Sequence, residues 1–340
     1  MHFTAVDNLI AWMASTGALA PWLFTALFLA GSLLTVWRLE AMASSGFEGT
    51  VLGTLIMPYC TGMGNLIFAF VLGQQGGSGA DVVTNCLVNN VTNMTLLIGL
   101  PVVLWGGNIL PSTVDRLGQP KKKTQTGAQQ LNRLSLLLTL VAVLFFTGAA
   151  WVVGRKGRFN FDDGLMLVGL FFFWQCFHVY EVLKTNVQKN RSFSWLLVVD
   201  VALLGIGAYA VYVSTDWLVG WVSHIHTGFV SAKNLGWLSG WLTVLPNGLL
   251  AFYYGWKRQP EVVYTSQVGD GHICIPFCLG IFALYKSFTV PASFNLGVEI
   301  LIGATLVHFF FVGVFGRLPR FVGLALVAAY GFYVYNGLAN

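Results

Sequence analysis

The stretch from Pro58 to Pro101 reads PYCTGMGNLIFAFVLGQQGGSGADVVTNCLVNNVTNMTLLIGLP, and it decides the fold. Glycines interrupt one apolar segment, and the next apolar segment carries Asn85, Asn89 and Asn93. Residues four positions apart share one face of a helix, so the three amides form a row. An amide that faces lipid without a hydrogen-bond partner costs on the order of several kcal/mol. We therefore expect the row to face protein, water or a ligand.

A similar stretch lies near the other end of the chain, from Leu242 to Ile281: LTVLPNGLLAFYYGWKRQPEVVYTSQVGDGHICIPFCLGI. Asn65 and Asn247 are each followed eight residues later by a glycine, then by a polar turn and a Val-Val pair. An alignment without gaps then pairs Asn85 with Ser266, Asn89 with Asp270, Asn93 with Cys274 and Gly99 with Gly280. We interpret the two stretches, 58–101 and 242–281, as copies of an internal repeat.

The composition predicts an integral membrane protein. Of the 340 residues 56% are hydrophobic and 9% are charged, and the mean hydropathy is +0.71. The net charge of +5 comes from loops and not from a basic patch with interleaved aromatic residues, so we expect lipid and not nucleic acid as a partner. Residues 1–17 lack a basic start and a small-residue cleavage site, which indicates an amphipathic segment at the membrane interface and not a signal peptide.

The hydropathy pattern predicts an all-α fold of about ten transmembrane helices, because each apolar segment is near the roughly 20 residues that cross a bilayer. The region from Asp216 to Leu235 is expected to be interfacial. The predicted spans are residues 20–37, 49–73, 80–105, 133–154, 163–186, 194–214, 230–256, 261–284, 293–315 and 319–337.

The spans divide into two five-helix halves, residues 18–187 and 188–340, and the first half contains a basic loop at 108–133. Most of the 18 lysines and arginines fall in loops on one side if both termini lie on the other. The positive-inside rule therefore predicts that both termini are non-cytoplasmic, in a plasma or inner membrane. An odd number of spans per half makes the two repeats enter the membrane in opposite directions, as in secondary transporters.

The five cysteines, Cys60, Cys86, Cys176, Cys274 and Cys278, all fall inside apolar segments. Free cysteine packs well as a small buried side chain, and that is the interpretation we favour. A soft-metal site made by His272, Cys274 and Cys278 is the alternative, although no cysteine pair has a CxxC spacing.

The repeat resembles that of the calcium/cation antiporter superfamily, the sodium/calcium exchangers and their relatives. In that family each half carries a Gly-Thr-Ser-Leu-Pro-Glu break in one helix, followed by a helix with Gly-Ser-Asn and a second Asn or Asp. The segment Leu242 to Asn247 matches the break at Thr243, Leu245 and Pro246, and the segment Cys60 to Asn65 matches it at Thr61. The segments Val88 to Asn93 and Gly269 to Cys274 correspond to the second element.

The resemblance implies a cation site at the middle of the membrane. Its residues would be Thr61, Asn65, Asn89, Thr92, Asn93, Thr243, Asn247, Asp270 and Cys274, with Asn65, Asn93, Asn247 and Asp270 as direct metal ligands. The family's two cation-binding glutamates align with Asn65 and Asn247, so Asp270 is the one acid at these positions. Because affinity for Ca²⁺ rises with the number of carboxylates, such a site should hold Ca²⁺ weakly.

The leading hypothesis is a secondary-active cation antiporter that works by alternating access, carries Ca²⁺, Na⁺ or H⁺ and needs no cofactor. One alternative is the same fold carrying a monovalent cation or a small neutral or organic solute; another is an intramembrane metal-dependent protein. No nucleophile motif or phosphate loop indicates an enzyme. Asp270 is the strongest single candidate, because an ionisable residue at mid-span is usually functional. For Asp200 and Glu181 a structural ion pair and a proton path are equally good interpretations, and for Glu299 and His308 we favour a structural role.

Overall fold

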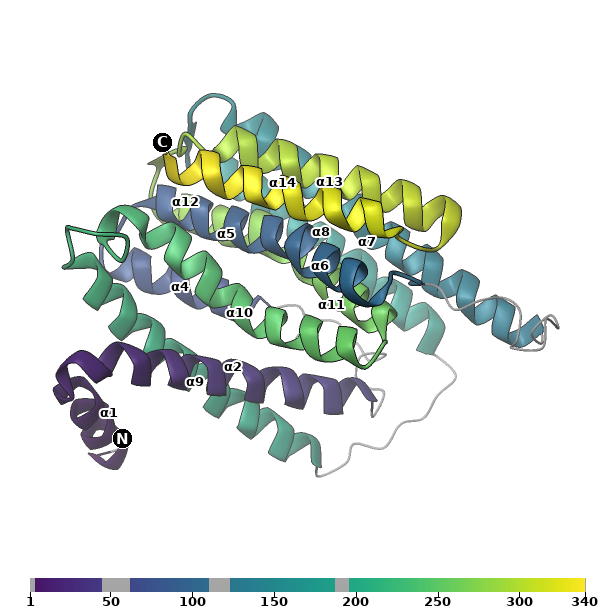
Figure 1. Ribbon diagram of the computed structural model, residues 1–340. Coiled ribbons are helices and arrows are strands. Elements are labelled where there is room, and N and C mark those ends of the chain that lie inside the picture. The colour runs from purple at the N-terminus through teal and green to yellow at the C-terminus, as the bar shows by residue number, and fades with distance from the viewer. Residues whose placement is uncertain (1–3, 45–61, 110–122, 187–195, 340) are drawn as a thin grey trace. The chain divides into compact units, whose positions relative to one another are not determined.

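The protein is almost entirely helical in the computed structural model, which describes residues 4–44, 62–109, 123–186 and 196–339 (Figure 1). The first half contains α1 (Thr4–Ser15), η1 (Gly17–Leu19), α2 (Ala20–Ser44), α4 (Met63–Gln74), α5 (Gly79–Met94), α6 (Leu96–Trp105), α7 (Lys123–Gly154), β1 (Arg158–Phe159) and α8 (Phe161–Asn186). The second half contains α9 (Leu196–Ser223), η3 (Ala232–Asn234), α10 (Leu235–Trp256), α11 (Pro260–Ile273), η4 (Cys274–Cys278), α12 (Leu279–Tyr285), β2 (Phe288–Thr289), α13 (Phe294–Phe315) and α14 (Arg320–Ala339).

Eight segments of the described chain are helical, long and apolar enough to cross a membrane. They are Gly17–Met42, Gly79–Trp105, Arg133–Gly154, Val198–Ser223, Ala232–Trp256, Pro260–Tyr285, Phe294–Phe315 and Arg320–Ala339. The two other predicted spans correspond to the short apolar helix α4, whose predicted start lies outside the described residues, and to the 26-residue helix α8.

One predicted boundary is wrong. The sixth span was expected to end at residue 214 and to be followed by an interfacial segment, but α9 continues to Ser223. The extra turns contain the apolar residues Leu218, Val219 and Val222, which are all buried. Asp216 therefore lies within a helix, where its side chain accepts a hydrogen bond from Gln75 Nε2 at 2.9 Å.

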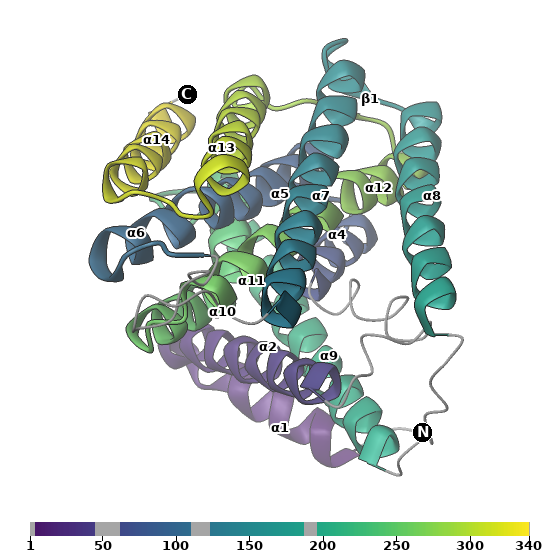
Figure 2. The ribbon, with the colours of Figure 1, turned by 90° about the vertical axis from the view of Figure 1, so that its right-hand side faces the viewer.

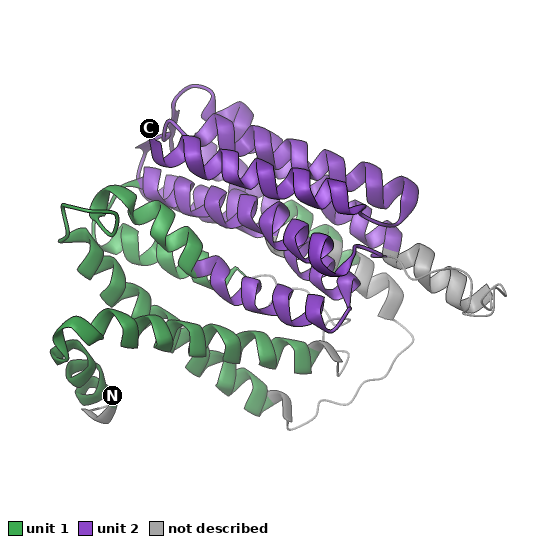
Figure 3. Cartoon of the chain, viewed as in Figure 1, with its two compact units in different colours: residues 1–78, 172–242 green, residues 79–171, 243–340 purple. Residues whose placement is uncertain are grey.

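The chain forms two compact units, which Figure 3 shows in different colours. Unit 1 comprises residues 1–78 and 172–242, and unit 2 comprises residues 79–171 and 243–340. These units do not coincide with the predicted halves, residues 18–187 and 188–340. The two halves therefore stay a prediction that concerns the sequence repeat.

In unit 1 the helices α2 and α9 pack tightly against each other. Gly31 and Gly207 lie at this contact, where a Cβ on either would come within 2.9 Å of the other's carbonyl oxygen. An ion pair of 3.3 Å between Arg38 and Asp200 joins the same two helices. Its side chains are 16% exposed, so the pair is mostly shielded from solvent. Of the two interpretations of Asp200, an ion pair and a proton path, the structure thus contains the ion pair.

In unit 2 the helix α5 is almost wholly buried, because α6, α11, η4, α12 and α13 all pack against it. On the outside of this group α14, α13 and α7 lie side by side, as Figure 2 shows. This arrangement gives α5 protein neighbours on most of its surface, which a helix with so many polar residues requires inside a bilayer.

Two glycine contacts in unit 2 correspond to each other under the sequence repeat. Gly99 of α6 lies against the carbonyl of Gly323 on α14, and Gly280 of α12 lies against the carbonyl of Gly164 on α8. Gly99 and Gly280 are aligned residues of the two repeats. Small residues allow helix backbones to approach closely in membranes, so each repeat uses the same kind of contact to attach the apolar helix after its polar segment to a helix of the other half.

Two short strand pairings also correspond to each other. β1 pairs antiparallel with β2, and Gly107 forms an isolated bridge with Leu318. β2 precedes α13 and Leu318 follows it, so the pairings lie at opposite ends of that helix. Each joins a loop of one half to a loop of the other, which fixes the ends of the helices of unit 2.

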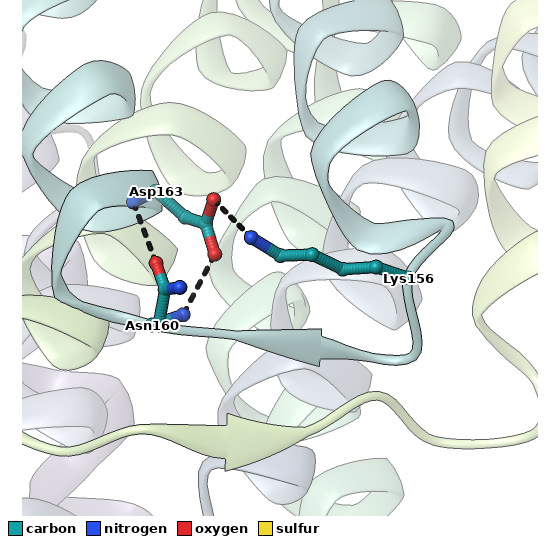
Figure 4. A network of polar contacts seen from close by, with 3 residues as sticks. All are labelled: Lys156, Asn160 and Asp163. Atoms are coloured by element: carbon teal, nitrogen blue, oxygen red, sulfur yellow. Dashed lines mark hydrogen bonds and ion pairs between the residues drawn. The ribbon is translucent and has the colours of Figure 1, made fainter.

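The N-terminus of α8 is closed by a reciprocal cap (Figure 4). Asn160 Oδ1 accepts a hydrogen bond from the backbone N–H of Asp163 at 3.1 Å, and Asp163 Oδ2 accepts one from the backbone N–H of Asn160 at 2.8 Å. This is the capping-box arrangement, built here from Asn and Asp. Lys156 Nζ donates to the other Asp163 oxygen at 2.6 Å, which connects the cap to the preceding turn.

We predict that Asp163→Ala lowers the free energy of unfolding by about 1 to 2 kcal/mol, because it removes the carboxylate that accepts from the N–H of Asn160 and from Lys156. The half-exposed ion pair with Lys156 contributes the smaller part, since exposed pairs are worth about 0 to 1 kcal/mol. The measurement is thermal unfolding in detergent. Asp162→Ala, an exposed acid one position earlier, is the matched control and should change little. Equal losses in the two variants would contradict the role of the cap.

Candidate functional site

The row of amides predicted from the sequence lies on α5 and is fully enclosed. Asn85, Asn89 and Asn93 have no solvent-exposed surface, and neither does Asn90, the fourth amide of this helix. The side-chain carbonyl oxygens of Asn85, Asn89 and Asn93 accept no hydrogen bond from the described residues, although each residue has other interactions. The row thus places several polar oxygens inside an apolar helix bundle, and such oxygens are suitable ligands for a cation.

The end of α5 is irregular next to Asn93. α5 ends at Met94, and Thr95, with φ −117° and ψ −72°, separates it from α6. Thr92 Oγ1 donates to the carbonyl of Val88 at 2.6 Å, and Thr95 Oγ1 donates to the carbonyl of Val91. Threonine hydroxyls that bond to the preceding turn often bend a helix. The Thr92 proton is therefore used within α5, and only the lone pairs of its oxygen can face a cation.

The helix that faces the row comes from the second repeat. Asn90 Nδ2 donates to the carbonyl of Gly271 on α11 at 3.0 Å. Asn89 Nδ2 lies 3.6 Å from Cys274 Sγ, and Cys86 Sγ donates to the carbonyl of Cys274 at 3.4 Å. Three residues on about one turn of α5 thus contact one short segment, 271–274, so the structure brings the predicted site residues Asn89 and Cys274 together.

A π-turn begins at Cys274, the last residue of the facing segment. η4 covers Cys274–Cys278 and contains Pro276, which has no backbone N–H to donate to the preceding turn. Single π-turns inside helices are rare and are frequent at functional sites. The turn gives the span Pro260–Tyr285 an irregular centre at the same point where the contacts with Asn89 and Cys86 fall.

The remaining predicted residues of unit 2 lie on α10 and α11. Thr243 and Asn247 are half-buried on α10, which contains Pro246. Gln267 Nε2 lies 3.5 Å from the backbone carbonyl of Asn247 and donates to Ser266 Oγ at 2.9 Å. Asp270 belongs to α11, but its side chain is outside the described residues.

In unit 1, Asn65 is 3% exposed on α4, and Thr61 lies outside the described residues. An approach of Asn65 to Asn247 stays a prediction, since they belong to different units.

Four residues that the sequence analysis did not assign to the site contribute to it. Asn90 is buried, and its side-chain amide donates to the carbonyl of Gly271. Gln267 is 1% exposed, and its Oε1 accepts no hydrogen bond from the described residues. Cys86 and His308 make contacts with residues about 190 and 210 positions away. Asn90 and Gln267 could have been found as polar residues at mid-span, whereas the contacts of Cys86 and His308 have no local signal.

The alternative soft-metal site consists of His272, Cys274 and Cys278. The side chain of His272 lies outside the described part of the structure, so this set stays a prediction. In the described part of the chain no group of three His, Cys, Asp or Glu side chains is arranged to hold a metal ion. Cys86, Cys274 and Cys278 are buried, as expected for packing, while Cys176 is exposed on α8.

His308 of α13 stabilises the end of α5. It is fully buried, and its Nε2 lies 2.8 Å from the carbonyl of Met94, the residue after Asn93. Its ring also packs edge-to-face on Tyr264 of α11 with centroids 5.4 Å apart. This one side chain therefore joins three helices at the α5–α6 break.

A cavity of about 440 Å³ lies in unit 2 near the ends of α6, α10 and α11. Its walls include Trp105, Arg258, Glu261 and Tyr264, but none of the amides of the row. The row is thus enclosed in this conformation and is separate from the cavity.

Comparison with known proteins identifies the class of this chain. Solved structures of the sodium-calcium exchanger NCX_Mj have the same fold: the crystal soaked with 10 mM Na⁺ and 10 mM Sr²⁺ matches with a TM-score of 0.62 and 19% identity, covering 93% of this chain and 97% of that one. The crystal soaked with zero Na⁺ and Ca²⁺ matches with a TM-score of 0.60 and 19% identity, covering 94% and 98%. No curated protein matches the chain. The chain therefore has the same helical fold as this exchanger.

The family is shown by the sequence of the chain. Two stretches, residues 17–180 and 199–338, each match the family described as sodium/calcium exchanger protein. The chain belongs to the sodium/calcium exchanger family, whose members are cation transporters and not enzymes. The predictions of this family, of an all-α membrane fold with two repeats and of a non-enzyme are confirmed.

We predict that His308→Leu destabilises the protein by about 1 to 3 kcal/mol, because a buried carbonyl loses its donor. His308→Gln should recover part of this loss, since a glutamine amide can donate to the same carbonyl. Unfolding midpoints in detergent test both variants, with Glu299→Gln, an exposed residue on the same helix, as the control. If Leu and Gln at position 308 gave equal midpoints, the hydrogen bond to Met94 would not be what His308 contributes.

Proposed function

We propose that this member of the sodium/calcium exchanger family is a secondary-active cation antiporter that works by alternating access. The observation that carries the proposal is the enclosed row of amides on α5, in contact with the irregular centre of the second-repeat span. A purely structural role would need fewer polar groups, because hydrogen bonds between membrane helices contribute only about 0.6 to 2 kcal/mol each.

The proposed site combines residues of both repeats. The first repeat supplies Thr61, Asn65, Asn89, Thr92 and Asn93, and the second supplies Thr243, Asn247, Asp270 and Cys274. Asn65, Asn93, Asn247 and Asp270 would be the direct metal ligands. In this assignment a cation is held mainly by amide and hydroxyl oxygens, and the single carboxylate of Asp270 supplies the negative charge.

Asparagines stand at the positions of the two family glutamates. Neutral amides at these positions favour either weak binding of a divalent cation or binding of a cation with lower charge density. Ca²⁺ prefers six to eight oxygens, and its affinity increases with the number of carboxylates among them. Ca²⁺ is therefore expected to bind weakly, and Na⁺ or H⁺ is the expected coupling ion. A monovalent cation as the transported substrate is the second candidate, and the same two asparagines support it.

The expected orientation places both termini on the non-cytoplasmic side, because most lysines and arginines then fall in cytoplasmic loops. We predict that a reporter fused after Asn340 is active only if it functions outside the cytoplasm. A fusion within the basic loop at 108–133 should give the opposite result. Matching signals from the two fusions would reject the odd number of crossings predicted between the loop and the C-terminus, and exchanged signals would reject the orientation.

Exchange is tested by cation flux in proteoliposomes. We predict that uptake of the transported cation requires an opposed gradient of Na⁺ or H⁺ and stops when that gradient is removed. Uptake that proceeds equally well without any counter-ion gradient would exclude antiport.

The site assignment is tested by two substitutions with opposite electrostatic effects. Asp270→Asn should abolish most cation affinity, because it removes the one carboxylate, and Asn247→Glu should raise divalent affinity by at least about tenfold, or ~1.4 kcal/mol. Isothermal titration with Ca²⁺ and Na⁺ measures both, with Asp162→Asn, a surface acid, as the control. Unchanged affinity and transport in Asp270→Asn would show that Asp270 is structural.

A further inference from the structure

Three thiols come together in the centre of unit 2. Cys86 lies on α5, while Cys274 and Cys278 lie at the two ends of η4 in the second repeat. All three side chains have no exposed surface. Cys86 bonds to the carbonyl of Cys274 at 3.4 Å and also forms a side-chain hydrogen bond with Cys278. The π-turn thus contacts Cys86 with the carbonyl at its first residue and with the sulfur at its last, while the sulfur of Cys274 faces Asn89.

The thiols are continuous with the row of amides. Cys86 lies one residue after Asn85, and Asn89 Nδ2 is 3.6 Å from Cys274 Sγ. A cation that binds beside Asn89 would therefore also be next to sulfur. In the sequence repeat Cys274 is aligned with Asn93, so sulfur occupies one of the duplicated positions of the proposed site.

Sulfur and oxygen ligands select different cations. Thiolates bind Cu(I), Zn²⁺ and other soft ions, whereas carboxylate and carbonyl oxygens suit Ca²⁺ and Mg²⁺. Soft monovalent ions such as Cu⁺ and Ag⁺ are well satisfied by two sulfur ligands in a line, so they do not need the three-residue groups that structural metal sites use. The amide of Asn89 could orient a sulfur ligand, as hydrogen bonds around metal ligands commonly do.

We propose that the cation site of this chain accepts a soft monovalent cation of the Cu⁺ and Ag⁺ class, bound by the sulfurs of Cys86 and Cys278 with Cys274 beside them. Each thiol that binds the ion forms a sulfur–metal bond and releases its proton to solvent, and no oxidation occurs. The inference deepens the proposed function, because it names the substrate class of the same site. Its alternative is that the three cysteines only fill space, as buried free cysteines often do.

The test uses Ag⁺ as the probe, because it does not change oxidation state under ordinary conditions. The background variant is Cys60→Ser with Cys176→Ser, which removes the other two thiols. In this background we expect purified protein to bind about one Ag⁺ per chain, to release protons on binding and to show an ultraviolet sulfur-to-metal absorption band. Adding Cys86→Ser or Cys278→Ser should weaken Ag⁺ binding by at least a hundredfold and remove the band.

Two further variants, Cys86→Ala and Cys278→Ala, serve as controls. Unfolding midpoints measured for every variant distinguish loss of the site from loss of the fold. Ag⁺ binding that persists in folded variants lacking Cys86 or Cys278 overturns the proposal. Failure of the two proposals can also be distinguished. If Ca²⁺ or Na⁺ transport depends on a counter-ion and the protein does not bind Ag⁺, the antiporter proposal holds and the soft-cation site is rejected. If the protein binds Ag⁺ tightly through its thiols but transports no cation, the soft-cation site holds and the antiporter proposal is rejected.

Discussion

The structure depends on how four asparagine side chains are accommodated within a single membrane helix. Hydrocarbon offers these amides no hydrogen bonds, so α5 must be enclosed by protein. The surrounding helices meet this need with backbone carbonyls as well as side chains: Gly271 accepts from Asn90, and Cys274 receives contacts at both its sulfur and its carbonyl. The central position of α5, the π-turn opposite and the burial of His308 at the end of α5 all follow from that constraint.

Close helix contacts make this enclosure possible. Hydrophobic association gives little advantage where lipid is as apolar as the protein, and small residues that let backbones approach replace it. Gly99 with Gly323 and Gly280 with Gly164 are such contacts, and they connect α6 and α12, which follow the polar segments of the two repeats, to helices of the opposite half. Because the same glycine serves at the same place in both repeats, the duplication extends from the site to its supporting framework.

The chemistry of the site departs from what the family resemblance implies in a consistent direction. Amides stand at the aligned glutamate positions, and a thiol stands where the second repeat would carry an amide or a carboxylate. Both changes remove negative charge from oxygen ligands, and the second adds a more polarisable ligand. The fold of the sodium/calcium exchanger family is therefore retained, while the ligands that we propose for its site differ from those that the resemblance implies.

The sequence by itself determined the membrane class, the positions of nearly all helices, the row of Asn85, Asn89 and Asn93, and the repeat that relates Gly99 to Gly280. These are local properties, since they depend on hydropathy over about 20 residues and on helical spacing. Only the tertiary structure decided that Asn90 bonds to Gly271, that Cys86 meets Cys274 and Cys278, and that His308 binds Met94. These partners are more than 180 positions apart in the sequence. No periodic pattern encodes such pairs, because they arise from the packing of helices that belong to different repeats.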